Sequence, residues 1–542
     1  MTSGPNTSTP PSRGRVVMLV DNGVHGDSRV QKTARSAAEA GWDVVLVGVL
    51  GHSAVERWQI GAAEVRLVPV RRSLGRHPTQ FRRSLRRPLA YPPGFEAGYR
   101  IQKVAAWQAA MHERRISRAL RGGKLRAAVL DGLQLPLRLS AKVLARWARF
   151  RAGELQRLTR NQQDPKTLIT RLSIGFWQKV LGPRSWRRLD PGLWMYELAF
   201  RTVIDELKPD LIHANDFRML GVGVRAARRA RAEGRQVKLV WDAHEFVAGV
   251  MPREENVRWL PAQVAHVEEY ISHADAVVTV SDTLAELLQQ THRLPTRPHV
   301  VLNAPVVTPP AAEPGASAPD LRQLCGVDPA TPLLVYCGGV NPTRGIEIMI
   351  DTLPAIPELH VALVTLSPSA NNSPSEELRA RAARLGVADR VHLLPYVKHW
   401  QVADFLSAAD AGVIPIHHQL NHELALITKF LEYSHARLPI VVSDVRTMAE
   451  TVRRTGQGEV FRAEDAEDYL RAVRAVLADP ERYRAAYDHP GLLAGWTWEA
   501  QAEILDELYG TLLPGRSRPA PVPAQPAPAA ASAPGARVEE RV

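Results

Sequence analysis

The chain has 542 residues, with 69 Lys or Arg, 56 Asp or Glu and a formal net charge of +13 at pH 7. This length predicts two to four domains, each able to bury its own core. The sequence shows no apolar signal-peptide core and no run of eighteen apolar residues, and Cys325 and Cys337 have no partners at zinc-ligand spacing. These features argue against a disulfide framework, a structural metal and a spanning helix, and we expect a cytoplasmic protein.

The positive charge is concentrated in one segment. Residues 71–188 contain 28 Lys or Arg and 5 Asp or Glu, which leaves 41 basic and 51 acidic residues elsewhere. The net charge therefore describes one basic segment inside an otherwise acidic protein.

The first half of the chain alternates between strand and helix patterns. After a polar segment, 1–14, that we expect to be disordered, the apolar stretch VVMLV is followed by the turn DNGVHGD and an Ala-rich helix. Such alternation predicts a parallel sheet with helices on its faces. The predicted strands lie near residues 16–20, 42–48, 65–70, 208–216, 237–245 and 274–282. We assign them to one domain, 15–307, with 71–188 as a basic helical insertion.

A second alternating unit follows a linker rich in Pro, Ala and Gly, residues 308–320. Its predicted strands lie near 331–339, 359–365, 390–396, 411–416 and 438–444. A closing helix at 498–513 could pack back on the first domain, and 514–542 is a low-complexity tail that we expect to be disordered. The fold class is therefore α/β, with a second domain at 321–513. Two doubly wound, Rossmann-like domains would face a cleft, where such sheets bind ligands at their carboxyl ends.

Two stretches of the second domain carry candidate binding residues. In CGGVNPTRG, Gly338 and Gly339 let backbone N–H groups approach an anion and Arg344 adds charge, although a solvated turn gives the same pattern. In ITKFLEYSHARLPIVVSD, residues 427–444, Thr428 could cap a helix that presents Lys429 and Glu432 on one face. The ammonium suits a diphosphate and the carboxylate suits a ribose diol. The alternative is a surface ion pair contributing about 0.2–0.5 kcal/mol.

These two motifs, the linker and the order of elements resemble the retaining glycosyltransferases of family 4, which have the GT-B fold. The resemblance extends through most of residues 15–513 outside the basic segment. The family pattern of a Lys, two residues, Glu-Tyr and then a Pro-Val-Val strand corresponds to Lys429, Glu432, Tyr433, Pro439, Val441 and Val442. The resemblance implies that Glu432 holds the nucleotide ribose and that Arg344 and Lys429 neutralise the leaving diphosphate.

The first domain contributes further candidates through the same resemblance. WDAHEF, residues 241–246, matches a family pattern whose histidine lies beside the transferred sugar, which assigns this role to His244. A structural histidine is the alternative. Weaker candidates on the acceptor side are Gly23, Asp27, Asp216 and Glu245. Asp27 and Asp216 could instead cap helices, and for Asp27 we expect the cap.

The sequence departs from the family pattern at three positions. Leu424 stands where many relatives have a glutamate, so that Glu423 would reach the sugar only through a one-residue shift. Gly339 stands where relatives have an arginine, and Arg437 where they have a glycine.

The resemblance implies a retaining hexosyl transfer from a nucleotide-diphosphate sugar to a carbohydrate or lipid-linked acceptor, such as a cell-envelope glycan. It implies no metal and no other cofactor. Leu424 and Gly339 motivate an alternative, a GT-B-like binding or scaffold protein with impaired catalysis. A nucleotide-sugar epimerase is a weaker alternative.

Within the insertion, residues 139–160 place Leu139, Val143, Trp147, Phe150 and Leu158 at helical spacing among Lys142, Arg146, Arg149 and Arg157. This pattern is typical of an interfacial helix on an anionic membrane surface, and would make the protein peripheral on the inner face of the membrane. The alternative is a helical hairpin whose apolar face packs on the domain. We do not expect nucleic acid as a partner, because no stacking platform or recognition motif accompanies the charge.

Overall fold

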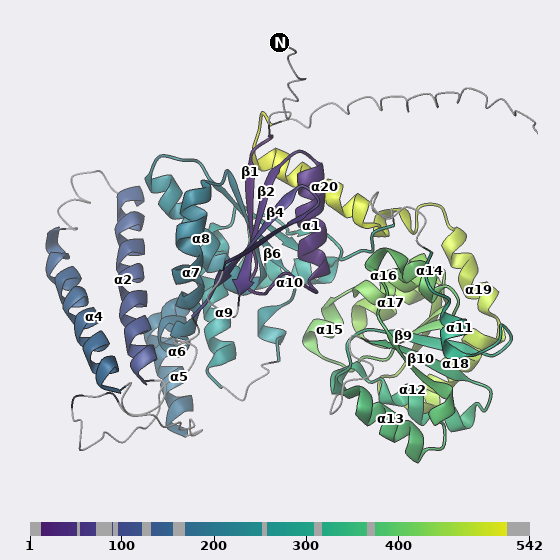
Figure 1. The fold of residues 1–542 in the computed structure, drawn as a ribbon. Helices are drawn as coiled ribbons and strands as arrows, with labels where there is room; N and C mark the ends of the chain where they lie inside the picture. The colour runs from purple at the N-terminus through teal and green to yellow at the C-terminus, as the bar shows by residue number, and fades with distance from the viewer. Residues whose placement is uncertain are drawn as a thin grey trace, which may run out of the picture.

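The computed structural model describes residues 12–50, 55–71, 89, 91, 96–121, 132–155, 168–251, 257–307, 317–365 and 374–516. Two α/β domains lie next to each other, and the last helix, α20 (Trp498–Leu512), runs along both (Figure 1). Each domain is built on one predominantly parallel sheet, so the predicted fold class is confirmed.

The first domain contains an eight-stranded sheet. Val17 and Leu19 lie in one core and Val16 and Met18 in the other, so that β1 is buried on both faces, as is typical of parallel strands between helical layers. In sheet order the strands are β3 (Glu56–Ile60), β4 (Ala63–Pro69), β2 (Asp43–Leu50), β1 (Arg15–Leu19), β5 (Leu211–Asn215), β6 (Lys238–Ala243), β7 (Ala276–Thr279) and β8 (His299–Val300).

The edge of this sheet differs from the sequence prediction. β3 pairs with β4 in the antiparallel direction, through a turn at Gly61 with φ +60°. Only one strand was predicted here, near 65–70. The sequence of β3, ERWQI, is mostly polar, because an edge strand exposes much of its surface and so lacks the apolar run of a buried strand.

Helices cover both faces of this sheet and form the insertion. The helices of the sheet are α1 (Ser28–Glu39), α7 (Trp194–Leu207), α8 (Asp216–Ala232), α9 (Trp259–Tyr270) and α10 (Asp282–His292). The described part of the insertion is helical, with α2 (Glu96–Arg121), α4 (Leu135–Leu155), α5 (Leu168–Leu181) and α6 (Trp186–Leu189). None of the described helices combines the length and the hydropathy of a membrane span.

The second domain contains a six-stranded parallel sheet. Its order is β11 (Val391–Pro395), β10 (His360–Thr365), β9 (Leu333–Cys337), β12 (Ala411–Ile414), β13 (Ile440–Ser443) and β14 (Gly458–Phe461), of which β14 was not predicted. Its helices are α11 (Leu321–Cys325), α12 (Glu347–Asp351), α13 (Pro374–Arg384), α14 (Val402–Leu406), α15 (Leu420–Leu424), α16 (Thr428–His435), α17 (Arg446–Thr455), α18 (Ala466–Ala478) and α19 (Pro480–Arg484).

Helix α20 belongs to the core of the first domain, although it follows the second in sequence. Trp498, Leu505 and Tyr509 are buried in the same cluster as β1 and α1. Its Asp506 accepts a hydrogen bond from Arg13 Nη1 at 2.6 Å, and Arg516 pairs with Asp210 at 2.8 Å. The expectation of disorder for 1–14 and 514–542 is therefore wrong at Arg13 and Arg516, because both arginines find carboxylates on the folded domain.

Candidate functional site

A cavity of about 1020 Å³ lies between the two domains and is lined by both. The first domain contributes residues that directly follow strands: Asp21 and Asn22 after β1, Asp216 after β5, and His244 and Glu245 after β6. The second domain contributes Arg344, Gln419, Asn421, His422 and Leu424. Because the carboxyl ends of parallel strands meet at one edge of a sheet, the cavity occupies the position where such folds bind ligands.

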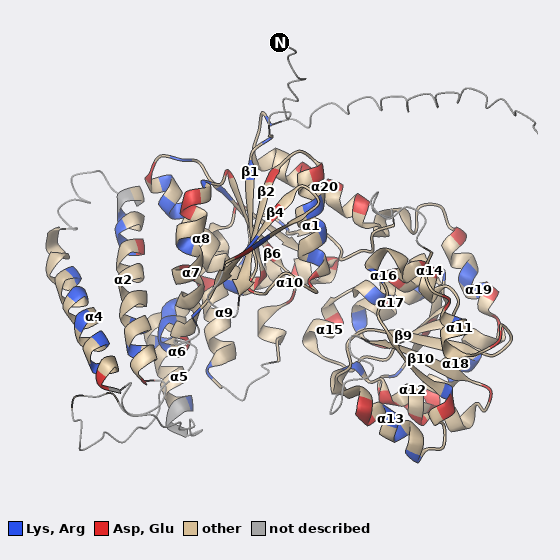
Figure 2. Ribbon diagram, viewed as in Figure 1, with Lys and Arg blue, Asp and Glu red and all other residues tan. Residues whose placement is uncertain are grey.

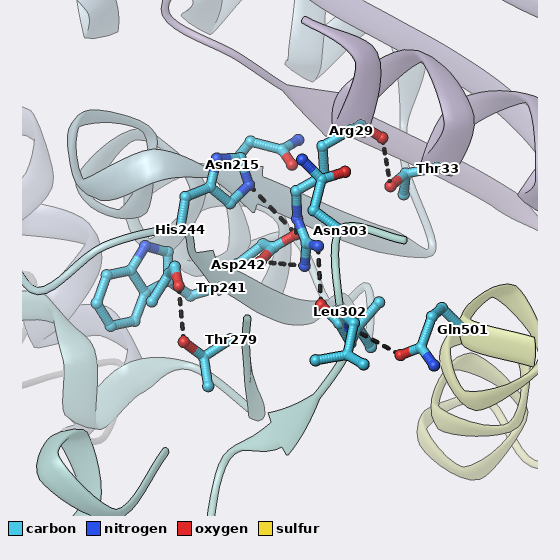
Figure 3. A network of polar contacts seen from close by, with 12 residues as sticks. Arg29, Thr33, Asn215, Trp241, Asp242, His244, Thr279, Leu302, Asn303 and Gln501 are labelled. Atoms are coloured by element: carbon cyan, nitrogen blue, oxygen red, sulfur yellow. Dashed lines mark hydrogen bonds and ion pairs between the residues drawn. The ribbon is translucent and has the colours of Figure 1, made fainter. Parts of the chain in front are cut away.

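His244 lies between two carboxylates on the first-domain side of this cavity. Its Nδ1 is 3.1 Å from Asp216 Oδ1, and its Nε2 is 3.3 Å from Asp242 Oδ2. Asp242 is buried and accepts two hydrogen bonds from Arg29 of α1, both at 2.9 Å (Figure 3). Burial favours the neutral imidazole, but the two carboxylates outweigh it and raise the pKa of His244 well above 6.5. The two carboxylates therefore favour the imidazolium form of His244.

Asp216 is held in an unusual backbone conformation. Its φ is +63°, in the left-handed region that residues other than glycine rarely adopt. The N-cap of α8 is Asn215, and no side chain caps this helix end. The interpretation of Asp216 as a helix cap is therefore wrong, since its carboxylate faces His244 and its carbonyl accepts a hydrogen bond from Trp241 Nε1 at 3.1 Å.

The raised pKa of His244 makes stability depend on pH. Because the folded-state pKa lies above the unfolded value of about 6.5, the stabilisation is fully present below that value and is lost as the pH rises through the folded pKa. Above pH 6.5 the free energy of unfolding should fall more steeply for the parent than for His244→Gln, by up to about 1.4 kcal/mol per pH unit. Urea unfolding across this range measures the two slopes, with the exposed His299→Gln as a control. Equal slopes for the parent and His244→Gln would contradict the assignment.

Two more carboxyl groups line the same side of the cavity. Asp21 pairs with Arg218, and burial together with the charge of Asp216 raises the pKa of Asp21. Burial and Asp216 also raise the pKa of Glu245. Sequence reasoning missed Asp21 and Arg218, although the position of Asp21 just after the first strand was a signal that could have identified it.

Gly338 and Lys429 lie in direct contact at the carboxyl end of β9. A Cβ placed on Gly338 would lie 1.9 Å from Lys429 Cε, so only glycine allows this close approach. Arg344, at the end of a short 3-10 helix, lines the cavity between the domains. The structure thus places Arg344 at the cavity, whereas Gly338 and Lys429 contact each other at the carboxyl end of β9 and are not among the residues that line it.

Glu432 is also partly buried beside Lys429 on α16. Burial raises the pKa of Glu432, and the nearby charges of Lys429 and Lys32 oppose this shift. The next residue, Tyr433, is fully buried and accepts a hydrogen bond from the Cys337 N–H at 2.9 Å, which ties α16 to β9. The Lys429–Glu432 pair is therefore not a freely solvated surface pair. The expected cap by Thr428 is wrong, because the N-cap is Ile427 and no side chain caps the helix.

Lys32 brings α1 of the first domain close to this pair. Its Nζ donates to Asn303 Oδ1 at 2.9 Å and to the Ala304 carbonyl at 2.5 Å. Burial and the nearby Arg29 lower the pKa of Lys32 to about 7, while Glu432 partly opposes the shift. No local sequence pattern indicates this residue, because the contact joins segments more than 250 positions apart.

Glu423 points away from the cavity. Its Oε1 lies 2.6 Å from His418 Nδ1, and its Oε2 accepts a hydrogen bond from the Arg446 N–H at 2.7 Å, at the start of α17. Leu424 lines the cavity instead, and its carbonyl accepts a hydrogen bond from Ser281 of the first domain at 2.5 Å. No one-residue shift occurs here, and the α15 segment serves as a contact between the domains.

The remaining candidates lie in the turn after β1. Asp27 caps α1, as expected, and accepts a hydrogen bond from the Val30 N–H at 3.2 Å and another from Asn22 Nδ2 at 2.8 Å. Gly23 lies in the same turn but not among the residues that line the cavity. Within the described residues, no group of three His, Cys, Asp or Glu side chains could hold a metal ion.

Solved structures with the same architecture identify the fold. Sucrose-phosphate synthase of Thermosynechococcus elongatus is 16% identical, with a TM-score of 0.54 over 92% of this chain and 99% of that one. Anabaena HepE, solved in complex with UDP and glucose, is 13% identical, with a TM-score of 0.52 over 92% and 100%. This fold is the GT-B fold of glycosyltransferases.

Sequence comparisons identify the family. The family model described as Glycosyltransferase Family 4 matches residues 156–304, and the one described as Glycosyl transferases group 1 matches residues 331–479. The chain belongs to the family 4 glycosyltransferases. Similar curated proteins include two named D-inositol 3-phosphate glycosyltransferase. The protein of Xylanimonas cellulosilytica is 27% identical over 51% of this chain and 67% of its own length, and that of Thermobispora bispora 29% over 47% and 60%.

Proposed function

We propose that this protein transfers a hexosyl group from a nucleotide-diphosphate sugar to a carbohydrate or lipid-linked acceptor, with retention of configuration. The observation that carries the proposal is the approach of Arg344 of the second domain and His244 of the first to one cavity, with Lys429, Glu432 and Gly338 at the same sheet edge. The family and the UDP and glucose in the HepE structure support this donor class.

The geometry gives each group a distinct role. Negative charge develops on the diphosphate as it leaves, and Arg344 and Lys429 would stabilise that charge. Glu432 would accept hydrogen bonds from the ribose. The two carboxylates that His244 faces raise its pKa well above the usual range, so His244 would shape the sugar pocket and not act as a general base.

Product analysis tests the proposal. The protein is incubated with UDP-, GDP- and ADP-sugars, with and without lipids and glycans extracted as acceptors from membranes of the organism that makes the protein. Retaining transfer predicts an acceptor-dependent product whose anomeric configuration, measured by NMR, equals that of the donor. An inverted product would contradict retention, whereas conversion of the donor without an acceptor would indicate an epimerase. Nucleotide binding without any product would favour the scaffold alternative, for which Leu424 in the cavity is the motivating observation.

A peripheral association with membranes is part of the proposal. The apolar side chains of α4 do not all pack on the domain: Leu139 is 54% exposed, Val143 66% and Phe150 51%. Lys142, Arg146 and Arg149 are exposed on the same helix, and Figure 2 shows the basic residues recurring along it. The predicted pattern extended to Leu158 and Arg157, which lie outside the described residues.

We expect sedimentation with vesicles that contain anionic lipid and little with purely zwitterionic vesicles. Each cation near an anionic surface contributes about 1 kcal/mol, and inserted apolar side chains add to this. The double variant Val143→Glu/Phe150→Glu should lose vesicle binding, whereas Leu385→Glu, at an exposed site of the second domain, should not. Binding that is indifferent to lipid charge would overturn this part of the proposal.

A further inference from the structure

The basic insertion contains a second large cavity, distinct from the one between the domains. This insertion cavity has a volume of about 1070 Å³ and lies mainly between α2 and α4, with further walls from the segment 181–194. The two helices lie side by side at the end of the molecule away from the second domain (Figure 1). Their shared apolar cluster is small and centred on Tyr91 and Ala148, so the helices meet there and leave the space beside Val104 and Trp107 open.

The walls of the insertion cavity are chemically divided. Apolar side chains from α2, α4 and α7, including Val104, Trp107, Leu144 and Trp194, form one part. The other part is cationic: seven Arg or Lys side chains and one carboxylate are among the described lining residues. That carboxylate, Glu96, already accepts a hydrogen bond from Arg100 at 2.5 Å. Arg184 and Arg187 are paired with Glu269, which lies outside the lining, so the excess of positive charge in the described walls is smaller than this count but remains around Lys103 and Arg188.

Lys103 shows the electrostatic consequence. Burial lowers the pKa of Lys103, and the neighbouring charges of Arg100 and Arg188 lower it further, with only Glu96 acting in the opposite direction. An anion between these three cations would relieve their mutual repulsion and could accept charge-assisted hydrogen bonds from them. An apolar chain attached to that anion would cover the aromatic and aliphatic walls.

We infer that the insertion cavity binds the phosphate-bearing end of an amphiphile, with the phosphate at Arg100, Lys103 and Arg188 and the apolar chain against Val104, Trp107 and Trp194. Divided walls of this kind fit neither a free anion nor an uncharged apolar molecule as well, because each would leave one part of the cavity uncovered.

The insertion cavity shares a wall with the cavity between the domains. Pro191 and Trp194 line the former, whereas the intervening Gly192 and Leu193, followed by Met195, line the latter. A bound amphiphile would thus lie directly behind the wall of the proposed reaction site, which suits a lipid-linked acceptor. This last point rests on the proposed function, whereas amphiphile binding itself does not.

Isothermal titration calorimetry with octyl phosphate, octyl glucoside and inorganic phosphate, all below micellar concentration, tests the inference on the full chain. Octyl phosphate should bind saturably with one site and at least about tenfold more tightly than either other compound, because only it engages both parts of the cavity. If inorganic phosphate bound as tightly as octyl phosphate, the apolar chain would play no part in binding and the amphiphile would be excluded as the ligand. If octyl glucoside bound as tightly, the phosphate site would be excluded. The absence of saturable binding would contradict both parts of the inference.

Matched variants locate the site. Lys103→Gln/Arg188→Gln should weaken octyl phosphate binding about tenfold or more, whereas Lys142→Gln/Arg146→Gln, which removes two exposed charges of α4 outside the lining, should change it less than about twofold. Val104→Phe narrows the apolar part of the cavity without changing charge and should also weaken binding. Equal weakening by both double variants would overturn the site. The nucleotide-induced thermal shift, measured on each variant, reports separately on folding and on the proposed function.

Discussion

Replacing Lys429 by Met is expected to lower kcat for sugar transfer by about 10²- to 10³-fold, because one preorganised charge that stabilises the departing diphosphate is removed. Methionine retains the aliphatic stem that packs against Gly338, so the fold of the turn should persist. The charge on the diphosphate grows during the reaction, and kcat should therefore fall more than KM rises.

The control for this variant is Lys238→Met, at a partly exposed lysine on the far end of β6 whose partner is Asp275 at 3.5 Å. Its kcat should equal that of the parent. Steady-state kinetics on purified proteins measures both variants. A kcat for Lys429→Met within about twofold of the parent would show that the ammonium does not stabilise the leaving group, and would leave Arg344 alone in that role.

Replacing Arg29 by Met is expected to lower the free energy of unfolding by about 3–5 kcal/mol, because the Asp242 carboxylate would remain buried without its principal partner. The side chains of Arg29 and Asp242 are 5% and 2% exposed, and the pair is joined by two hydrogen bonds. Arg29 also donates to the Val301 carbonyl at 2.8 Å, so its loss frees one end of the connection between the domains.

A matched pair at the surface separates this effect from the loss of an arginine as such. Arg297 and Asp282 are joined at 2.7 Å, but their side chains are 44% and 76% exposed. Arg297→Met should therefore cost about 0–1 kcal/mol. Chemical denaturation of both variants gives the comparison, and a similar small cost for each would mean that Asp242 is compensated by His244 or His213.

The parts of the structure that were predictable from sequence depend on local signals. Strands such as β1 and β13 are unbroken apolar runs, and the 427–444 motif places Lys429 and Glu432 on one turn of helix regardless of what surrounds it. The turn at Gly338 followed from glycine and strand position in the same way.

The parts that were not predictable depend on contacts between distant segments. Arg29 and Asp242 are 213 positions apart, and nothing in either local sequence specifies their pairing. The orientation of the Glu423 side chain is set by the N-terminus of α17, because the Arg446 backbone N–H group donates a hydrogen bond to its carboxylate. Arg13 and Arg516 lie in polar segments that resemble disordered tails, and only the folded domain supplies their carboxylate partners.

Lys429 and Glu432 are expected to bind a nucleotide-diphosphate sugar. A thermal-shift panel of UDP, GDP, ADP and their sugar conjugates tests this binding on the parent, Glu432→Ala and Glu450→Ala, the last at an exposed glutamate of α17. At one hundred times the dissociation constant, binding stabilises the folded state by about 2.7 kcal/mol, enough for a measurable rise in Tm. We expect one nucleotide to raise the Tm of the parent and of Glu450→Ala but not of Glu432→Ala. An equal shift in Glu432→Ala, or no shift in the parent with any compound, would contradict the claim.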